Sequence, residues 1–120
     1  MLGKPLPIWK GMIDKSRPYL SLKDAFLVIK FTLEENFFKN NIYNILSQNL
    51  TLKNVIKSFK RYKKNIKIIY QTSKLVNQYP YIISNQKFSL EAFKLKSKIS
   101  DDIKLTLKQF KYLSNEMQNN

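Results

Sequence analysis

The chain has 120 residues and a formal net charge of +14 at pH 7, and it contains neither cysteine nor histidine. Its length allows one small domain. The two missing residue types exclude disulfides, thiolate or imidazole metal sites and histidine-dependent catalysis. The electrostatic field of a chain with so high a net positive charge attracts polyanions. The composition therefore favours a nucleic-acid partner. No run of about 18 apolar residues is present, so we expect no transmembrane segment.

The first twenty residues are typical of an extended arm. Pro5, Pro7 and Pro18 disfavour helix and push the residues before them towards extended backbone. The arm also holds the only tryptophan, Trp9. Two interpretations remain open at this point. Trp9 packs the arm against the body of the protein, or the arm enters RNA and places its cations on phosphates, namely Lys4, Lys10, Lys15 and Arg17.

Two helices are predicted between this arm and Thr51. Ser21 and Asp24 have the spacing of a capping box, and the helix that they open repeats apolar residues at helical spacing, which assigns them to the core. A break is expected at 36–41, and a second, short helix ends near Gln48 or Asn49. The apolar positions are Leu22, Ala25, Phe26, Ile29, Leu33 and Phe37 in the first helix, and Ile42, Ile45, Leu46 and Leu50 in the second.

A long basic helix is predicted from Thr51, its N-cap, to Tyr79, where Pro80 stops it. One face is apolar and another is basic. No acidic residue lies between Asn36 and Phe88, whereas a merely solvated helix usually mixes charges. We therefore predict that the cations of this segment bind RNA, and they are Lys53, Lys57, Lys60, Arg61, Lys63, Lys64, Lys67 and Lys74.

Tyrosines interleave with these cations at positions 62, 70, 79 and 81. Aromatic faces stack on unpaired bases, but tyrosines at such spacings also pack in a core or at its rim. Both interpretations stay open from the sequence.

The last third of the chain predicts two further helices. Residues 88–99 fit a strand or a helix, and helix is preferred because the neighbouring segments are helical. Ser100 caps the last helix, and Asp101 and Asp102 follow at its positive end. These two carboxylates, like Glu34 and Glu35, have no partner base or glycine-rich loop nearby. We therefore expect no enzymatic activity, no cofactor and no small-molecule substrate.

Together these elements predict an all-α fold. An extended arm, 1–20, precedes a single helical domain, 21–120, in which a small helical bundle packs with the long basic helix 51–79. A helix of this length exceeds what so short a chain buries, so part of it is expected to project.

Three stretches resemble the second half of the bacterial-type large-subunit ribosomal protein L-twenty family. They read IKSFKRYKKNIKIIY at 56–70, ISNQKF at 83–88 and ISDDI at 99–103, within a similarity that spans residues 53–113. Tyr70 stands where the family has tryptophan. The resemblance implies a long basic helix, a small helical C-terminal domain and binding of ribosomal RNA without catalysis. The implied RNA contacts are Lys57, Lys60, Arg61, Lys63, Lys64 and Lys67.

The sequence therefore predicts a structural constituent of an organellar ribosome, with ribosomal RNA and neighbouring ribosomal proteins as partners in a large assembly. Residue types with AT-rich codons (Lys, Asn, Ile, Phe and Tyr) make up half of the chain, which favours an organellar source and a location in the mitochondrial matrix. The alternative is an accessory subunit of an organellar membrane complex, with its basic face towards anionic lipid headgroups.

Overall fold

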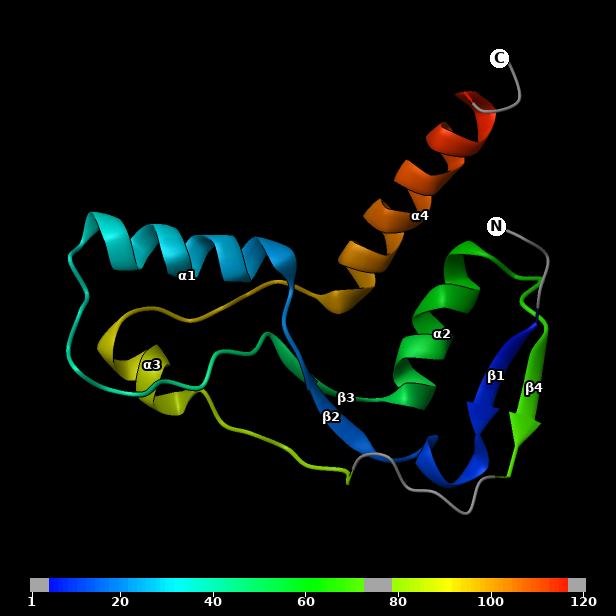
Figure 1. Cartoon of the computed structure of the whole chain (residues 1–120), viewed down its shortest axis with the longest axis horizontal. Helices are drawn as coiled ribbons and strands as arrows, with labels where there is room; N and C mark the ends of the chain where they lie inside the picture. The colour runs from blue at the N-terminus through cyan, green and yellow to red at the C-terminus, as the bar shows by residue number, and fades with distance from the viewer. Residues whose placement is uncertain (1–4, 73–78, 117–120) are drawn as a thin grey trace.

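The computed structural model describes residues 5–72 and 79–116, and the side chains of residues 5–72 and 79–112. The described chain forms four α-helices and two two-stranded sheets, so the fold is mixed and the all-α prediction was wrong (Figure 1). In chain order the elements are β1 (Leu6–Trp9), the 3-10 helix η1 (Lys10–Met12), β2 (Ser16–Tyr19), α1 (Leu22–Glu34), β3 (Gln48–Thr51), α2 (Leu52–Tyr62), β4 (Ile68–Gln71), α3 (Gln86–Glu91) and α4 (Ile99–Glu116).

The molecule is flat, with principal extents of 47 × 44 × 22 Å. In Figure 1, α1 and α3 lie on the left, and α2 lies on the right beside the β1–β4 pair. The β2–β3 ribbon crosses between the two halves. α4 begins near the middle and packs against α2.

The N-terminal segment is extended, as predicted, but it contributes a strand to each sheet. β1 pairs in parallel with β4, with Leu6 opposite Ile68, and β2 pairs antiparallel with β3, with Ser16 opposite Thr51. Each sheet has two strands, so every strand keeps an open edge on which the prolines are tolerated. The segment is therefore part of the body of the protein.

The long helix predicted for 51–79 is a shorter helix followed by a strand. Thr51 caps α2 as predicted, because its Oγ1 accepts a hydrogen bond from the Asn54 N–H at 3.2 Å. α2 then ends after 11 residues, and Lys63 is extended (φ −135°, ψ 94°). The residues that follow are rich in β-branched and aromatic types, which favour strand. They form β4, and residues 73–78 lie outside the described residues.

Two other predicted helices are also corrected. Residues 42–47 are irregular, and β3 follows them because its backbone pairs with β2. Of the helix predicted at 88–99, residues 88–91 are helical as the end of α3 and Ile99 begins α4, whereas the chain is irregular from Phe93 to Lys98. Phe88 and Phe93 both enter the same aromatic cluster. Residues five apart on a continuous helix point in different directions, so the helix must end between them.

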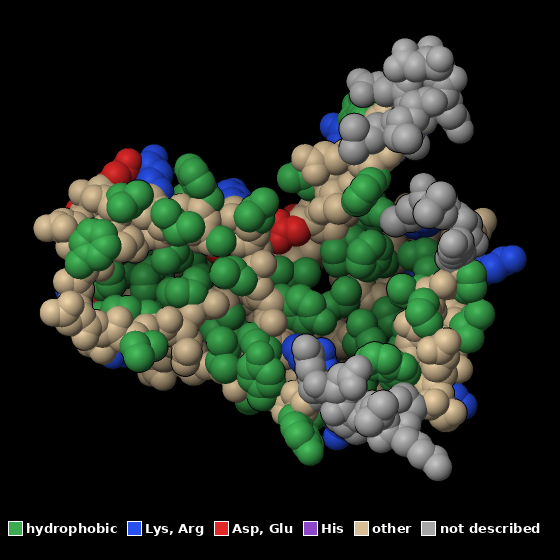
Figure 2. Space-filling view, viewed as in Figure 1, with side chains coloured by type: hydrophobic (Ala, Val, Ile, Leu, Met, Phe, Trp, Pro, Cys, Tyr) green, Lys and Arg blue, Asp and Glu red, His purple; other side chains and the backbone are tan. Residues whose placement is uncertain are grey.

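α1 has the predicted range, but its apolar face is turned outward. Ser21 is the N-cap, and the helix ends just before Asn36, which has a left-handed φ of 49°. Four apolar side chains predicted to be core are between 61% and 84% exposed. We call them the apolar stripe of α1: Leu22, Phe26, Ile29 and Leu33. Figure 2 shows hydrophobic side chains along this helix at the upper left.

Two apolar clusters form most of the core, and Ile8 and Leu46 are buried as well. The first is an aromatic cluster around the buried Phe88, with ring centroids 5.2–6.4 Å apart. Its members are Phe31, Phe37, Tyr43, Phe88 and Phe93. The second lies where α2 packs on α4 and buries Ile56, Ile99 and Ile103.

A serine–aspartate network joins the starts of α1 and α4 to the residue that precedes β3. Asp24, which is 1% exposed, accepts hydrogen bonds from the hydroxyls of Ser47 and Ser97, both at 2.6 Å. The Ser21 hydroxyl donates to Asp102 Oδ1 at 3.0 Å. The predicted capping box of Ser21 and Asp24 therefore marks the helix start, but its side chains bond to other elements and not to each other's backbone.

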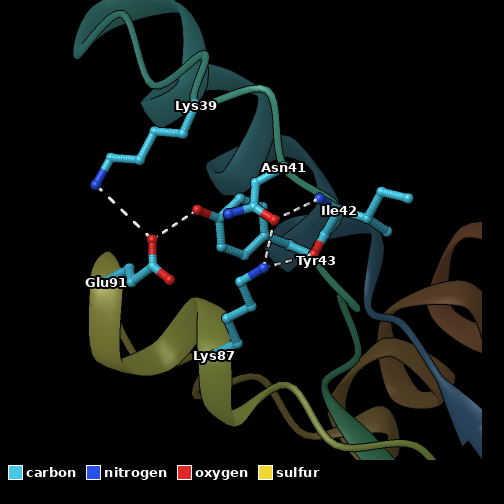
Figure 3. Close-up of polar contacts among 6 residues, drawn as sticks. All are labelled: Lys39, Asn41, Ile42, Tyr43, Lys87 and Glu91. Carbon is cyan, nitrogen blue, oxygen red and sulfur yellow. Dashed lines mark hydrogen bonds and ion pairs between the residues drawn. The ribbon is translucent and has the colours of Figure 1, made fainter.

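α3 is held to residues 39–43 by polar contacts, which Figure 3 shows. Glu91 accepts a hydrogen bond from the Tyr43 hydroxyl at 2.6 Å and lies 3.8 Å from the Lys39 ammonium. Lys87 donates to the Asn41 side-chain oxygen, and its Nζ lies 4.9 Å from the Tyr43 ring centroid. The hydrogen bond to Glu91 raises the pKa of the Tyr43 phenol above its ordinary value of 10.0. These contacts close the aromatic cluster at its outer side.

Candidate nucleic-acid interface

The outer side of α2 carries a row of exposed cations. Lys53, Lys57, Lys60 and Arg61 follow the spacing of one helix face, and all four are exposed. We call this set the α2 cationic face. Ile56 faces the other way, is buried, and belongs to the seam with α4. Packing of the apolar side against α4 therefore fixes the cationic face towards solvent.

Most of the α2 cationic face has no counterion among the side chains that the structure describes. Among the described residues, Lys57, Lys60 and Arg61 make no ion pair. Lys53 pairs with Asp14 at 3.5 Å, but the two side chains are 69% and 71% exposed. Ion pairs between two exposed side chains contribute little to the stability of the fold. The face is therefore available to an external polyanion.

The helix end also favours these charges. Lys60 and Arg61 lie in the last turn of α2, and no acidic residue lies in its first turn. Cations near a helix C-terminus interact favourably with the helix dipole. The sequence of α2 therefore places Lys60 and Arg61 at the end of the helix where their positive charges are favourable.

The other predicted RNA contacts do not share this helix face. Lys63 is the half-buried C-cap of α2, Lys64 lies in the turn that follows, and Lys67 directly precedes β4. Lys74 lies outside the described residues. The structure brings four of the eight predicted residues together on one face, and it carries three more on the connection to β4.

A cleft of about 350 Å³ opens near the start of α2. The N-terminal segment supplies most of its described wall, and none of the described lining residues is acidic. The lining residues are Pro7, Ile8, Trp9, Met12, Lys15, Arg17, Tyr19, Leu52 and Gln71. Two contacts place the cleft beside the α2 cationic face: the Lys53 N–H donates to the Ile13 carbonyl at 2.9 Å, and Lys53 pairs with Asp14.

Some residues of this cleft were singled out from the sequence, but they were not predicted to lie together. Trp9, Lys15 and Arg17 were assigned to alternative roles, and Tyr19 was not singled out. A usable signal is the spacing of Lys15, Arg17 and Tyr19, because residues two apart on a strand share a face. The contributions of Leu52 and Gln71 had no local signal, since each depends on long-range strand pairing.

The acidic side chains of the described residues form no metal-binding cluster. No group of three or more acidic, cysteine or histidine side chains is close enough to hold a metal ion there. Asp102 belongs to the serine–aspartate network, and Glu34 pairs with Lys30 at 3.7 Å. Within the same residues, no helix has the length and apolar character needed to cross a membrane.

Comparison of the chain with protein-family models, with curated proteins and with solved structures gives no match. The functional argument therefore rests on the sequence and on the geometry of the α2 cationic face and the adjacent cleft.

Proposed function

We propose that the chain is a non-catalytic constituent of a ribosome that binds ribosomal RNA through the α2 cationic face. The observation that carries this proposal is the exposed set Lys57, Lys60 and Arg61, which no acidic side chain of the described chain neutralises. When such cations neutralise phosphates, the condensed counterions of the nucleic acid are released, and this release drives binding.

The length of the face suits a nucleic-acid backbone. Lys53 and Arg61 are eight positions apart on α2, which corresponds to about 12 Å along the helix axis. A rigid row of this length contacts a few successive phosphates and reads no bases. Such contacts position a protein on RNA without specifying sequence.

Two further observations support a place in a large assembly. The sequence resemblance to the L-twenty family suggests a ribosome with neighbouring ribosomal proteins as partners, although the long helix that it implies over 56–70 is replaced by the end of α2 and the start of β4. The small core leaves many large apolar side chains exposed, including the whole apolar stripe of α1. Contiguous exposed apolar surface marks interaction sites in soluble proteins. The mitochondrial location within this proposal rests only on the high proportion of residue types whose codons are AT-rich.

A charge-matched pair of triple variants tests the RNA interface. Replacing Lys57, Lys60 and Arg61 by glutamine should weaken binding to labelled RNA and reduce the magnitude of the log–log salt slope by about 2 to 3. The control replaces Lys23, Lys94 and Lys96, which are equally exposed but lie outside α2. Both variants should keep the far-ultraviolet circular dichroism of the parent. Equal affinity and salt slope for the two variants would refute the interface.

The apolar stripe of α1 favours a second candidate function, an accessory subunit of an organellar membrane complex. Its four side chains are flanked by the exposed Lys23 and Lys30. An exposed apolar stripe with lysines beside it is suited to contact with an anionic lipid surface. In this case the stripe contacts an apolar surface of the complex at the membrane, and the lysines face lipid headgroups.

Fractionation of lysates distinguishes the two candidates. Sedimentation with ribosome-sized particles that is abolished by ribonuclease is the result expected for the ribosomal constituent. Sedimentation with membranes that is insensitive to ribonuclease but released by detergent would favour the second candidate and contradict the first.

A further inference from the structure

We propose that the cleft lined by Trp9, Lys15, Arg17 and Tyr19 binds one unpaired nucleotide of the RNA strand that lies on the α2 cationic face. The inference rests on the proposed function and adds a second, chemically distinct subsite to it. The ligand class is a single-stranded RNA segment with one base turned into the cleft.

The aromatic wall is placed for stacking. Trp9 is 43% exposed and makes no ring–ring contact with another aromatic side chain among the described residues. Its backbone is fixed because Trp9 pairs with Gln71 in the β1–β4 sheet and its neighbour Ile8 is buried. A held aromatic ring with an accessible face is what base stacking requires, and such stacking tolerates any base.

Another part of the lining is cationic. Lys15, Arg17 and Tyr19 alternate along the segment that includes β2, so their side chains share one face of that strand. Two positive groups on one side of the cleft suit a phosphate, and the Tyr19 phenol adds a second ring. The Gln71 amide supplies both a donor and an acceptor for a base edge.

The size of the cleft and its position agree with this ligand. A volume of about 350 Å³ lies within the range of small-ligand sites. The backbone hydrogen bond from Lys53 to Ile13 joins the start of α2 to the loop that borders the cleft. A strand whose phosphates follow the α2 cationic face therefore reaches the cleft at Lys53, where the next nucleotide enters.

Trp9 is the only tryptophan in the chain, so its fluorescence reports on this site alone. Titration of the full chain with single-stranded RNA should quench Trp9 fluorescence to saturation, at the same concentrations at which anisotropy of labelled RNA detects binding. Duplex RNA should bind without this quenching, because its bases are already stacked. A free nucleoside monophosphate should not quench in this concentration range, and equal quenching by it would overturn the assignment to an RNA strand.

Variants separate stacking from general electrostatic binding. Trp9→Leu should reduce affinity for single-stranded RNA about tenfold and leave duplex affinity unchanged, whereas Trp9→Phe, which retains a ring, should keep most of the affinity. Lys15→Gln should raise the RNA concentration needed to quench Trp9 fluorescence more than Lys10→Gln does, because Lys10 is exposed and does not line the cleft. Circular dichroism verifies that each variant is folded.

The outcomes distinguish the two proposals. One outcome is that RNA binds with the salt slope expected for the α2 cationic face while Trp9 fluorescence is not quenched and Trp9→Leu does not change the affinity. This result would overturn the proposed cleft site and leave the proposed α2 interface intact. The absence of any RNA binding in the anisotropy measurement would overturn both.

Discussion

The Asp24 carboxylate accepts a hydrogen bond from the Ser97 hydroxyl at 2.6 Å, although 73 residues separate the two in sequence. The second oxygen of the same carboxylate accepts from Ser47. One buried acid thus links α1, the residue before β3 and the segment that leads into α4. These are the places where the two halves of the molecule meet (Figure 1).

Removing this acid should destabilise the whole fold. Asp24→Ala leaves two part-buried hydroxyls without their acceptor, and hydrogen bonds to a charged group contribute more than neutral ones. We expect the free energy of unfolding in urea to fall by about 3 kcal/mol. Asp101→Ala is the control, because Asp101 is an exposed acid at the start of α4. A loss no larger than that of the control would show that the network does not hold the halves together.

The outward orientation of α1 predicts an unusual tolerance to polar substitution. Phe26→Gln and Ile29→Gln together should change the free energy of unfolding by no more than about 0.5 kcal/mol, because both side chains are exposed in the folded chain. Phe88→Ala, at the centre of the aromatic cluster, should cost about 3 to 5 kcal/mol. Urea unfolding followed by circular dichroism measures both. A loss from the glutamine pair as large as that from Phe88→Ala would mean that the stripe is core.

The pairing of Asp14 with Lys53 predicts a variant with tighter RNA binding. Asp14→Asn removes the acid beside the α2 cationic face and leaves Lys53 without an internal counterion. Affinity for RNA at low salt should rise, and the salt slope should steepen by about 0.7 to 0.9 if Lys53 gains one phosphate contact. Stability should be almost unchanged, because both side chains are exposed. Weaker binding in this variant would contradict the placement of RNA at Lys53.

The contact between Tyr43 and Glu91 predicts a pH dependence at the alkaline end. The hydrogen bond to the carboxylate raises the pKa of the Tyr43 phenol in the folded protein, so the folded state holds that proton more tightly than the unfolded state. The resulting stability is complete below the ordinary pKa of 10.0. It is lost as the pH rises above that value through the raised folded pKa.

Glu91→Gln tests this relationship directly. The variant removes the carboxylate charge, so the pKa of Tyr43 should move down towards its ordinary value. A pH titration of the tyrosine ring resonances by nuclear magnetic resonance measures the shift. An unchanged Tyr43 pKa in the variant would show that the hydrogen bond is not made in solution.

Local signals in the sequence were enough for some elements. The range of α1, the Thr51 cap of α2 and the start of α4 within one residue of Ser100 all depend on capping and on short periodicities. The common helix face of Lys53, Lys57, Lys60 and Arg61 follows from the same short periodicity, although the helix predicted for them ran to Tyr79 and α2 ends at Tyr62.

The sheets were missed because their evidence is not local. Ile66 and Ile69 lie three positions apart, which continues a helical repeat, yet Ile69 is in β4, which pairs with β1 about sixty positions earlier. Gln48–Thr51 likewise becomes a strand only because β2 lies beside it. The inward side of α1 was misassigned for a related reason. A helix with apolar residues all round does not reveal which side the rest of the chain covers.

The dependence of both sheets on the N-terminal segment has a consequence for the order of folding. β1 and β2 leave a translating ribosome before the other described elements, yet their partners β4 and β3 are synthesised much later. Parallel pairing across such a separation has a high contact order and forms slowly. β2 therefore waits for its partner until residues 48–51 emerge, and β1 waits until residues 68–71 emerge. The growing chain needs protection from aggregation at least until β4 has been synthesised.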